Sequence, residues 1–449
     1  MALDIPRETA LKILYDINEK GAYSNISINK YLDNSELRDL DKGFITELVY
    51  GTVKWKLSID WIIEQFSSIK IRKLSPWILN ILRLGVYQLI YMDKIPESAA
   101  CNESVNLSKR YGHAASSRYV NGVLRGIARN KGNIKYPEPK EDFNLYLSVK
   151  YSHPKWMVDQ WIERFGSSFT ENLLKSNNIT PDLIIRVNTL KASKEQLAES
   201  LRDEGVEVEN ARYVEDAFII KNSSSITKLK AFKDGWFQVQ DESSMLVSKV
   251  LNPCPGDLVI DVCSAPGGKS THIAQLMKNE GTVMARDIHD HKIKIINDAA
   301  KRLGQSIIKT EVFDASKLDE NYLGKADKVL VDAPCTGFGI IRRKPDIKWA
   351  RNLNDKSEIL ELQKKILRVS SNYVKSGGVL VYSTCTIEPE ENISMVEEFL
   401  KENKDFMLED ISPLLPEKLK KPEAAKGYIQ LYPNVDEIDG FFMARLIRR

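Results

Sequence analysis

Two cysteines in this sequence follow apolar runs that are typical of buried strands. Cys385 ends the run GGVLVYSTC (377–385), and Cys335 follows VLVDAP (329–334). The thiolate is the reactive form, and only about 3% of an unperturbed thiol is ionised at pH 7. A lone cysteine is usually a small buried hydrophobe, which we expect of Cys101. Two cysteines on carboxyl-end loops of one sheet instead predict covalent nucleophilic chemistry in a shared pocket.

A glycine-rich turn, DVCSAPGGKSTHI (261–273), joins an apolar run to a helical pattern. Gly267 and Gly268 let backbone N–H groups approach a ligand, and a helix N-terminus favours negative charge. The turn is neither the GxGxxG of nicotinamide-binding proteins nor a GxxxxGK[ST] phosphate loop. An ordinary strand-to-helix turn is the alternative, and the preceding Asp with the Pro-Gly-Gly-Lys sequence argues against it.

Three acids stand where successive predicted strands end: Asp287, Asp314 and Asp332. Each alone is more typical of a turn or a helix cap. In a doubly wound sheet, however, ligands lie across these strand ends, where acids can bind ribose hydroxyls and an adenine amine. Together with the glycine-rich turn, they predict a nucleoside site that suits S-adenosylmethionine better than ATP.

The elements that must position these residues fall into three predicted domains. Apolar residues at three- and four-residue spacing predict helices throughout residues 1–135, including one run over 41–66. Residues 143–232 mix helical and strand patterns and predict a small α+β module. Residues 233–449 alternate strand and helix, which predicts an α/β domain with a doubly wound parallel sheet.

Composition is that of a water-soluble globular protein: 449 residues, 43% hydrophobic and 28% charged. No apolar run reaches membrane-spanning length, and the N-terminus lacks a secretory pattern. Five widely spaced cysteines predict reduced thiols in the cytoplasm, and the absence of CxxC with only five scattered His predicts no metal site.

Basic residues are concentrated in two places although the net charge is only +3. Residues 104–131 contain six Lys or Arg and no acid, and Arg342, Arg343 and Lys344 follow Cys335 closely. Such patches with interleaved Tyr are typical of phosphate-backbone binding. A solvated helix face explains the first patch equally well.

Several motifs together resemble the RNA cytosine-C5 methyltransferases of the NOL1/NOP2/Sun group. They are the glycine-rich turn, the two cysteine motifs DAPCTG and YSTC, IRRKPDIKW (341–349) and FQVQDESSMLV (237–247). The N-terminal SKRYG and RYVNGVLRGIAR segments resemble NusB-type RNA-binding domains. The resemblance covers essentially the whole chain. TGFG stands where such enzymes commonly have SGTG, which leaves loop packing in doubt but not the class.

The resemblance implies a Rossmann-like S-adenosylmethionine-dependent methyltransferase domain preceded by an all-α NusB-like domain and a small α+β module. It assigns Cys385 as the nucleophile that adds to cytosine C6, Cys335 to release of the adduct, and Asp332 to the cytosine N3 and amine edge. The implied cofactor-binding residues are Cys263, Ser264, Ala265, Pro266, Gly267, Gly268, Lys269, Asp287, Asp314 and Asp332.

The implied substrate is one cytosine of small-subunit (16S) ribosomal RNA, either free or in an early assembly intermediate, bound by a monomer. The base must be flipped out or lie in a loop, because C5 and C6 are unreachable within a helix. The candidate RNA contacts are Lys109, Arg110, Arg118, Arg125, Arg129, Arg186, Asn188, Arg342 and Arg343.

Other functions remain as alternatives: methylation of a tRNA, or a non-catalytic RNA-binding assembly factor. A DNA cytosine methyltransferase would use the PC-type cysteine and would need neither the second cysteine nor the helical domain. An adenine-N6 enzyme would carry an Asn/Asp-Pro-Pro-aromatic motif, which this sequence lacks.

Overall fold

The computed structural model describes residues 4–33, 35–222, 225–350 and 355–449. The chain forms two compact units, Met1–Ile179 with Ile341–Ala350, and Thr180–Ile340 with Arg351–Arg449. The first boundary falls inside the module predicted for 143–232, and the domain limits drawn from the sequence remain predictions. Within the described ranges, no helix combines the length and apolar character needed to span a bilayer.

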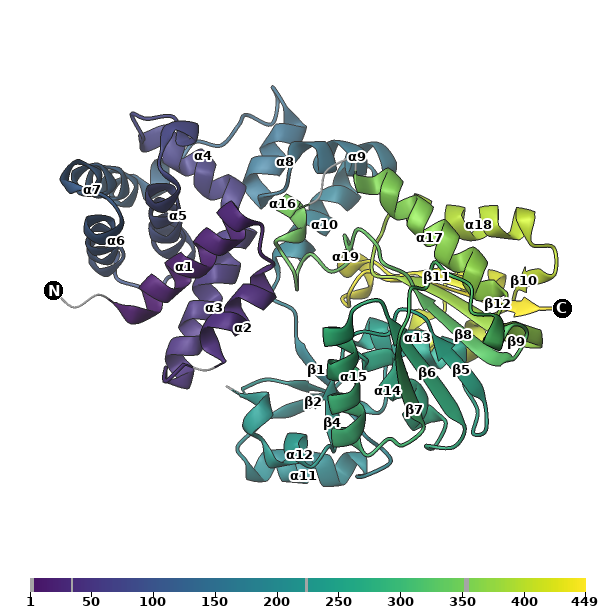
Figure 1. The fold of residues 1–449 in the computed structure, drawn as a ribbon. Helices are drawn as coiled ribbons and strands as arrows, with labels where there is room; N and C mark the ends of the chain where they lie inside the picture. The colour runs from purple at the N-terminus through teal and green to yellow at the C-terminus, as the bar shows by residue number, and fades with distance from the viewer. Residues whose placement is uncertain (1–3, 34, 223–224, 351–354) are drawn as a thin grey trace. The chain divides into compact units, whose positions relative to one another are not determined.

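The first unit, here called the helical unit, is built from helices, as the sequence predicts (Figure 1). Ser75 precedes a helix with Pro76 at its first position, where the missing N–H is not needed. Its helices are α1 (Ile5–Lys20), α2 (Ser24–Leu32), α3 (Asp39–Lys54), α4 (Lys56–Phe66), α5 (Pro76–Tyr91), α6 (Glu97–Tyr111), α7 (Ala114–Arg129), α8 (Phe143–Tyr151), α9 (Lys155–Phe165), α10 (Ser167–Asn178) and α16 (Ile347–Ala350).

The single helical run predicted over 41–66 is two helices that meet at Trp55. The break coincides with hydrogen bonds from α16, whose side chains donate to backbone carbonyl oxygens at the end of α3. Lys348 Nζ donates to Lys54 O at 2.8 Å, and Trp349 Nε1 donates to Val53 O at 2.8 Å. These contacts join segments almost 300 residues apart, and local periodicity cannot reveal them.

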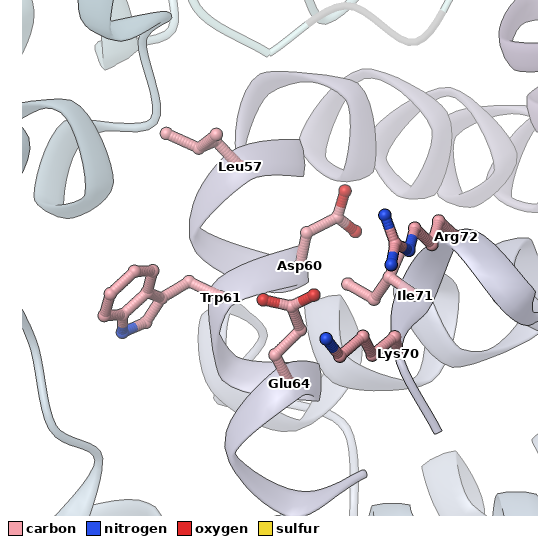
Figure 2. Close-up of a pocket in the computed structure, with 7 residues that line it drawn as sticks. All are labelled: Leu57, Asp60, Trp61, Glu64, Lys70, Ile71 and Arg72. Atoms are coloured by element: carbon pink, nitrogen blue, oxygen red, sulfur yellow. The ribbon is translucent and has the colours of Figure 1, made fainter. Parts of the chain in front are cut away.

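A crevice of about 490 Å³ lies in the helical unit between α4 and the short 3-10 turn Ile71–Lys73. Figure 2 shows Asp60 and Glu64 of α4 facing the side of the crevice that carries Lys70 and Arg72. Asp60 already accepts two hydrogen bonds from the buried Arg83, at 2.7 and 2.8 Å. Charges of both signs line this crevice, and it contains neither cysteine of the predicted site.

The second unit is here called the catalytic unit because it contains the residues predicted to carry the chemistry. It includes a small antiparallel sheet of order β2-β3-β1-β4. Ile185 and Phe218 pack with α11 residues in its own core, whereas Ile184 on the opposite face joins the core of the large sheet. Its elements are β1 (Leu183–Val187), α11 (Lys194–Asp203), β2 (Val208–Asn210), β3 (Ala217–Ile220), α12 (Lys230–Lys233) and β4 (Phe237–Val239).

The large sheet has the order β10-β12-β9-β8-β5-β6-β7, with β11 paired to β12. The strands from β9 through β7 are parallel, whereas β12 runs antiparallel to β9. Its strands are β5 (Leu258–Asp261), β6 (Thr282–Asp287), β7 (Ile308–Val312), β8 (Ala326–Asp332), β9 (Val374–Thr384), β10 (Phe406–Leu408), β11 (Tyr428–Gln430) and β12 (Phe442–Arg448).

Helices cover both faces of this sheet, which confirms the predicted doubly wound, Rossmann-like fold. Alternate residues of one strand enter different cores: Leu330 packs with α13 and α14, and Val329 and Val331 pack with α17 and α18. Figure 1 shows α14 and α15 on one side of the strands and α17 and α18 on the other. The helices are α13 (Glu242–Leu251), α14 (Gly268–Leu276), α15 (Asp290–Leu303), α17 (Asp355–Ser371), α18 (Ile393–Glu402) and α19 (Pro433–Asp436).

Candidate active site

The two cysteines singled out from the sequence lie against each other in the catalytic unit. Cys385 follows β9 directly, and Cys335 lies three residues beyond the end of β8, the parallel neighbour of β9. Their Sγ atoms are 3.2 Å apart, and both side chains are half-buried. Carboxyl ends of parallel strands meet at one edge of the sheet, so the fold brings together thiols that are fifty residues apart.

The residue after each cysteine locks the two loops together. Thr336 Oγ1 and Thr386 Oγ1 are 2.8 Å apart, and Gly339 N donates to Cys385 O at 3.0 Å. A side chain at Gly339 could not be tolerated, because its Cβ would lie 1.8 Å from Gly440 O. The spacing of the two thiols is therefore fixed by neighbouring polar and backbone contacts.

Glu391 is the buried anchor of the Cys335 loop. It accepts hydrogen bonds from Thr336 N at 3.0 Å, Thr336 Oγ1 at 2.5 Å and Gln363 Nε2 at 2.9 Å. Burial raises the pKa of Glu391, and the bonds from Thr336 and Gln363 offset only part of that rise. Sequence reasoning did not single out Glu391, because in EPEEN it reads as one more acid at a helix start.

Negative charge on Cys335 is disfavoured by its surroundings. The hydrogen bond with Cys385, burial and the nearby Glu391 all raise the pKa of the Cys335 thiol well above its ordinary value. Cys335 therefore keeps its proton more readily than an exposed cysteine, and its S–H can donate a hydrogen bond to the neighbouring sulfur.

Asp332 joins the cysteine loops to the glycine-rich turn. Lys269 Nζ lies 2.7 Å from Asp332 Oδ2, and Ser383 Oγ donates to Asp332 Oδ1 at 2.7 Å. Burial alone would lower the pKa of Lys269, but the Asp332 carboxylate outweighs it and the net shift is upward. The site thus holds a lysine ammonium beside a carboxylate whose two oxygens have fixed partners.

A pocket opens beside this ion pair, and we call it the cofactor pocket because residues predicted from the sequence to bind a cofactor line it. Seven of the ten predicted cofactor residues line it: Cys263, Ser264, Ala265, Pro266, Gly268, Lys269 and Asp332. Its remaining lining residues are Val239, Gln240, Asp241, Ser244 and Asp261. The four residues from 239–244 fall within the motif FQVQDESSMLV, so the sequence motif could have identified them as lining residues.

Asp261 gives the cofactor pocket an unused acceptor. Its Oδ2 accepts a hydrogen bond from Ser270 Oγ at 2.6 Å, whereas Oδ1 is buried without a partner among the described residues. Burial, reinforced by repulsion from Asp332, raises the pKa of Asp261 to about 7. The pocket therefore offers an unpaired carboxylate oxygen, further acids and a backbone that glycine leaves accessible. These groups suit a ligand with hydroxyls, an amine and a positive charge.

Three predicted cofactor residues lie outside the lining of this pocket. Gly267 takes a left-handed conformation, and a Cβ there would lie 3.3 Å from Ile296. Asp287 ends β6 and accepts from the backbone of His289 at 3.1 Å. Asp314 accepts from the backbone of Ser316 at 2.9 Å, and hydrogen bonds from Ser316 lower its pKa. Both acids stand near the strand ends, as predicted, and both also cap local turns.

The basic residues predicted to bind RNA differ in exposure. Five lie exposed on α6 and α7 of the helical unit: Lys109, Arg110, Arg118, Arg125 and Arg129. Lys109 and Arg118 line a groove of about 800 Å³ between these two helices. Arg342 and Arg343 are half-buried in the segment Ile341–Ala350.

The structure corrects the prediction that Arg186 and Asn188 contact RNA. Their exposed fractions are 0% and 1%, which leaves no side-chain surface for a phosphate. Asn188 Nδ2 donates to Gly235 O and Leu303 O at 2.8 and 2.9 Å. Arg186 donates its hydrogen bonds to acceptors within the same unit. Both side chains therefore stabilise the interior of the catalytic unit.

Three family descriptions match successive parts of the chain. The description "16S rRNA methyltransferase RsmB/F" matches residues 248–447, and "NusB family" matches residues 4–129. A ferredoxin-like domain described as RsmF/B-like matches residues 153–227.

Curated relatives match over nearly the whole length. "Probable ribosomal RNA small subunit methyltransferase B" of Bacillus subtilis (strain 168) is 40% identical over 446 residues, 99% of this chain and 98% of the relative. "Ribosomal RNA small subunit methyltransferase B" of Klebsiella pneumoniae is 32% identical, with the same coverage of each chain.

Solved structures show the same fold. The crystal structure of PH0851 superposes with a TM-score of 0.82 and 30% identity, covering 100% of both chains. NSun6 from Pyrococcus horikoshii with SFG has a TM-score of 0.58 and 26% identity, covering 66% of this chain and 98% of that one. Sequence and structure together place this chain in the RsmB/F family of methyltransferases, with a NusB-family region in its N-terminal part.

Proposed function

We propose that this protein transfers a methyl group from S-adenosylmethionine to C5 of a cytosine in 16S ribosomal RNA. The contact of Cys335 and Cys385 beside the Lys269–Asp332 ion pair carries the proposal. Curated relatives bear the name of small-subunit ribosomal RNA methyltransferases, and the similar NSun6 structure holds SFG, an analogue of S-adenosylmethionine.

The residues of the cofactor pocket fit this cofactor. The orphaned Oδ1 of Asp261 can accept from a hydroxyl or an amine, and the turn around Gly268 lets backbone groups approach the ligand. Asp287 and Asp314 at neighbouring strand ends would complete the ribose and adenine contacts. When bound, S-adenosylmethionine supplies an electrophilic methyl group carried on a positively charged sulfur.

The nucleophile is Cys385, as the family resemblance implies. Its thiolate adds to C6 of the flipped cytosine and forms an Sγ–C6 bond, while the electron pair of the C5–C6 double bond makes C5 nucleophilic. Asp332 holds the amine and N3 edge of the base, and its pair with Lys269 supplies the proton that N3 takes up. C5 of cytosine becomes reactive only while this adduct exists.

Cys335 assists the release of the methylated base. Once C5 carries the new methyl group, its proton passes to water, and the electron pair of that C–H bond re-forms the C5–C6 double bond as the Sγ–C6 bond breaks and its electrons return to Cys385. N3 returns its proton to the Lys269–Asp332 pair in the same stage, which restores the neutral base. Because the pKa of Cys335 is raised, its S–H remains available to donate a hydrogen bond to the departing sulfur at 3.2 Å.

The helical unit is proposed to bind the RNA around the target base. The exposed Lys109, Arg118, Arg125 and Arg129 form a stripe on α6 and α7 that suits a phosphate backbone. Their replacement should weaken binding and reduce its salt dependence without changing the two thiols.

Two cysteine variants test the assignment. Cys385→Ala should abolish 5-methylcytosine formation while S-adenosylmethionine still binds, and Cys335→Ala should accumulate a protein–RNA adduct that survives denaturation. An adduct trapped by Cys385→Ala would reverse the two roles. Bisulfite sequencing of RNA from a deletion strain tests the substrate, and loss confined to transfer RNA would overturn the ribosomal assignment.

A further inference from the structure

Arg186 carries a buried positive charge that the proposed chemistry does not use. It lies on β1 of the small antiparallel sheet, and its side chain is completely buried. The guanidinium donates to four acceptors: Gly268 O at 2.9 Å, Thr271 Oγ1 at 3.1 Å, Gln275 Oε1 at 3.1 Å, and Gln240 Oε1.

All four acceptors are neutral, which makes this an unusual place for a guanidinium. Among the described residues, no carboxylate hydrogen-bonds to Arg186. Burial lowers the pKa of Arg186 to about 9, and repulsion from Arg302 adds to the shift. Arg186 therefore stays charged at neutral pH. Burying a charge costs more free energy than burying an apolar side chain of similar size, so we expect this charge to serve a function.

Two of the four acceptors belong to the wall of the cofactor pocket. Gly268 ends the glycine-rich turn and begins α14, and Gln240 lies opposite it. Their packing is close, since a Cβ at Gly268 would lie 3.6 Å from Gln240 Cδ. Thr271 and Gln275 belong to α14 itself. One planar group thus sets the position of the turn, of α14 and of Gln240 together.

We propose that Arg186 is a positioning residue for the cofactor: its guanidinium holds Gly268 and Gln240 in the places that S-adenosylmethionine requires. The inference rests on the proposed function, because it takes the cofactor pocket to be the S-adenosylmethionine site. Arg186 acts on the affinity for the cofactor and not on RNA binding, although its Arg-Val-Asn-Thr context is typical of a phosphate contact.

Arg302 provides a matched control. It is half-buried, and Nη1 donates to Phe232 O and Phe237 O, both at 2.9 Å. It therefore ties α15 to the same small sheet through neutral acceptors, as Arg186 ties α14, but it does not line the cofactor pocket. Arg302→Met therefore measures how far a general loosening of the small sheet weakens cofactor binding.

The experiment compares Arg186→Met, Arg186→Lys and Arg302→Met in the full chain. Calorimetry measures binding of S-adenosylmethionine and of S-adenosylhomocysteine, and steady-state assays give separate KM values for cofactor and RNA. Loss of hydrogen bonds from a charged donor predicts a cofactor KM about tenfold higher or more for Arg186→Met. Arg186→Lys should lie between this variant and the wild type, because an ammonium keeps the charge and reaches only some of the acceptors.

The outcomes separate the possible roles of Arg186. A KM for RNA that rises while cofactor binding stays unchanged would restore the RNA contact and overturn the inference. Equal effects of Arg186→Met and Arg302→Met would reduce Arg186 to a general packing role and also overturn it. If Arg186→Met does not fold, Arg186→Lys decides by the same two KM values. Failure of the wild type to bind S-adenosylmethionine would instead overturn the proposed function itself.

Discussion

Replacement of Glu391 should separate the two cysteine loops, because this carboxylate alone anchors three donors. Glu391 is fully buried and accepts two bonds from Thr336 and one from Gln363. Three bonds to a charged acceptor stabilise the fold by about 4–5 kcal/mol. Relief of the burial that raises the pKa of Glu391 offsets part of this loss. We therefore expect Glu391→Ala to lower the free energy of unfolding by about 3 kcal/mol.

Two companion variants sharpen this prediction. Glu391→Gln keeps one acceptor oxygen for Thr336 and removes the buried charge, so it should cost only about 1 kcal/mol. Glu390→Ala is the matched control, because the half-exposed Glu390 lies 3.2 Å from Lys356 and such pairs contribute less than about 1 kcal/mol.

Urea denaturation at constant pH measures all three stabilities, and the rate of covalent adduct formation with RNA reports the position of the thiols. Glu391→Ala should slow adduct formation more than it weakens cofactor binding, since the cofactor pocket does not include Glu391. A loss of less than about 1 kcal/mol in Glu391→Ala, or equal losses in the Ala and Gln variants, would refute the anchoring role.

Three further changes follow from buried groups. Burial lowers the pKa of Lys348 well below its usual value, so unfolding binds a proton and stability rises with pH. Lys348→Met should flatten this slope in urea titrations at pH values below the ordinary lysine pKa of about 10. Burial, then repulsion from Lys348, also lowers the pKa of His153, so stability should fall as pH drops below about 6.5, and His153→Gln should reduce that loss. Gly339→Ala should cost about 3 kcal/mol or more, because its Cβ would overlap Gly440 O, whereas Gly122→Ala on open α7 surface should stabilise by about 0.5–1 kcal/mol in thermal denaturation.

Periodicity and strand-end chemistry were sufficient to predict much of the catalytic unit. The alternation of strand and helix predicted the sheet and placed Asp287 and Asp332 at strand ends, because parallel strands separated by helices leave few topologies. The sequence pattern beyond residue 385 predicted no strand. The β12 strand (Phe442–Arg448) pairs antiparallel with β9, and only the tertiary fold shows that a terminal segment returns to that edge.

Arg186 shows why a charged residue in a strand is difficult to interpret from sequence. Within β1, Ile185 and Val187 face the core of the small sheet, and Ile184 and Arg186 share the other face. Alternation therefore predicts two faces, but it does not say that the second is also buried. From the sequence, an arginine near Asn and Thr therefore resembles an RNA contact. In the structure the second face of the strand is also buried, and Arg186 on that face donates to the glycine-rich turn.

The surroundings of Cys335 disfavour this thiol as the nucleophile, independently of the family resemblance. Glu391 lies on the side of Cys335 and raises the pKa of that thiol, so negative charge is disfavoured there. Cys385 instead interacts electrostatically with Lys269, and this interaction contributes to the raised pKa of Lys269. Cys335 is therefore suited to keep its proton and to donate a hydrogen bond to the neighbouring sulfur, which is the role proposed for it in release.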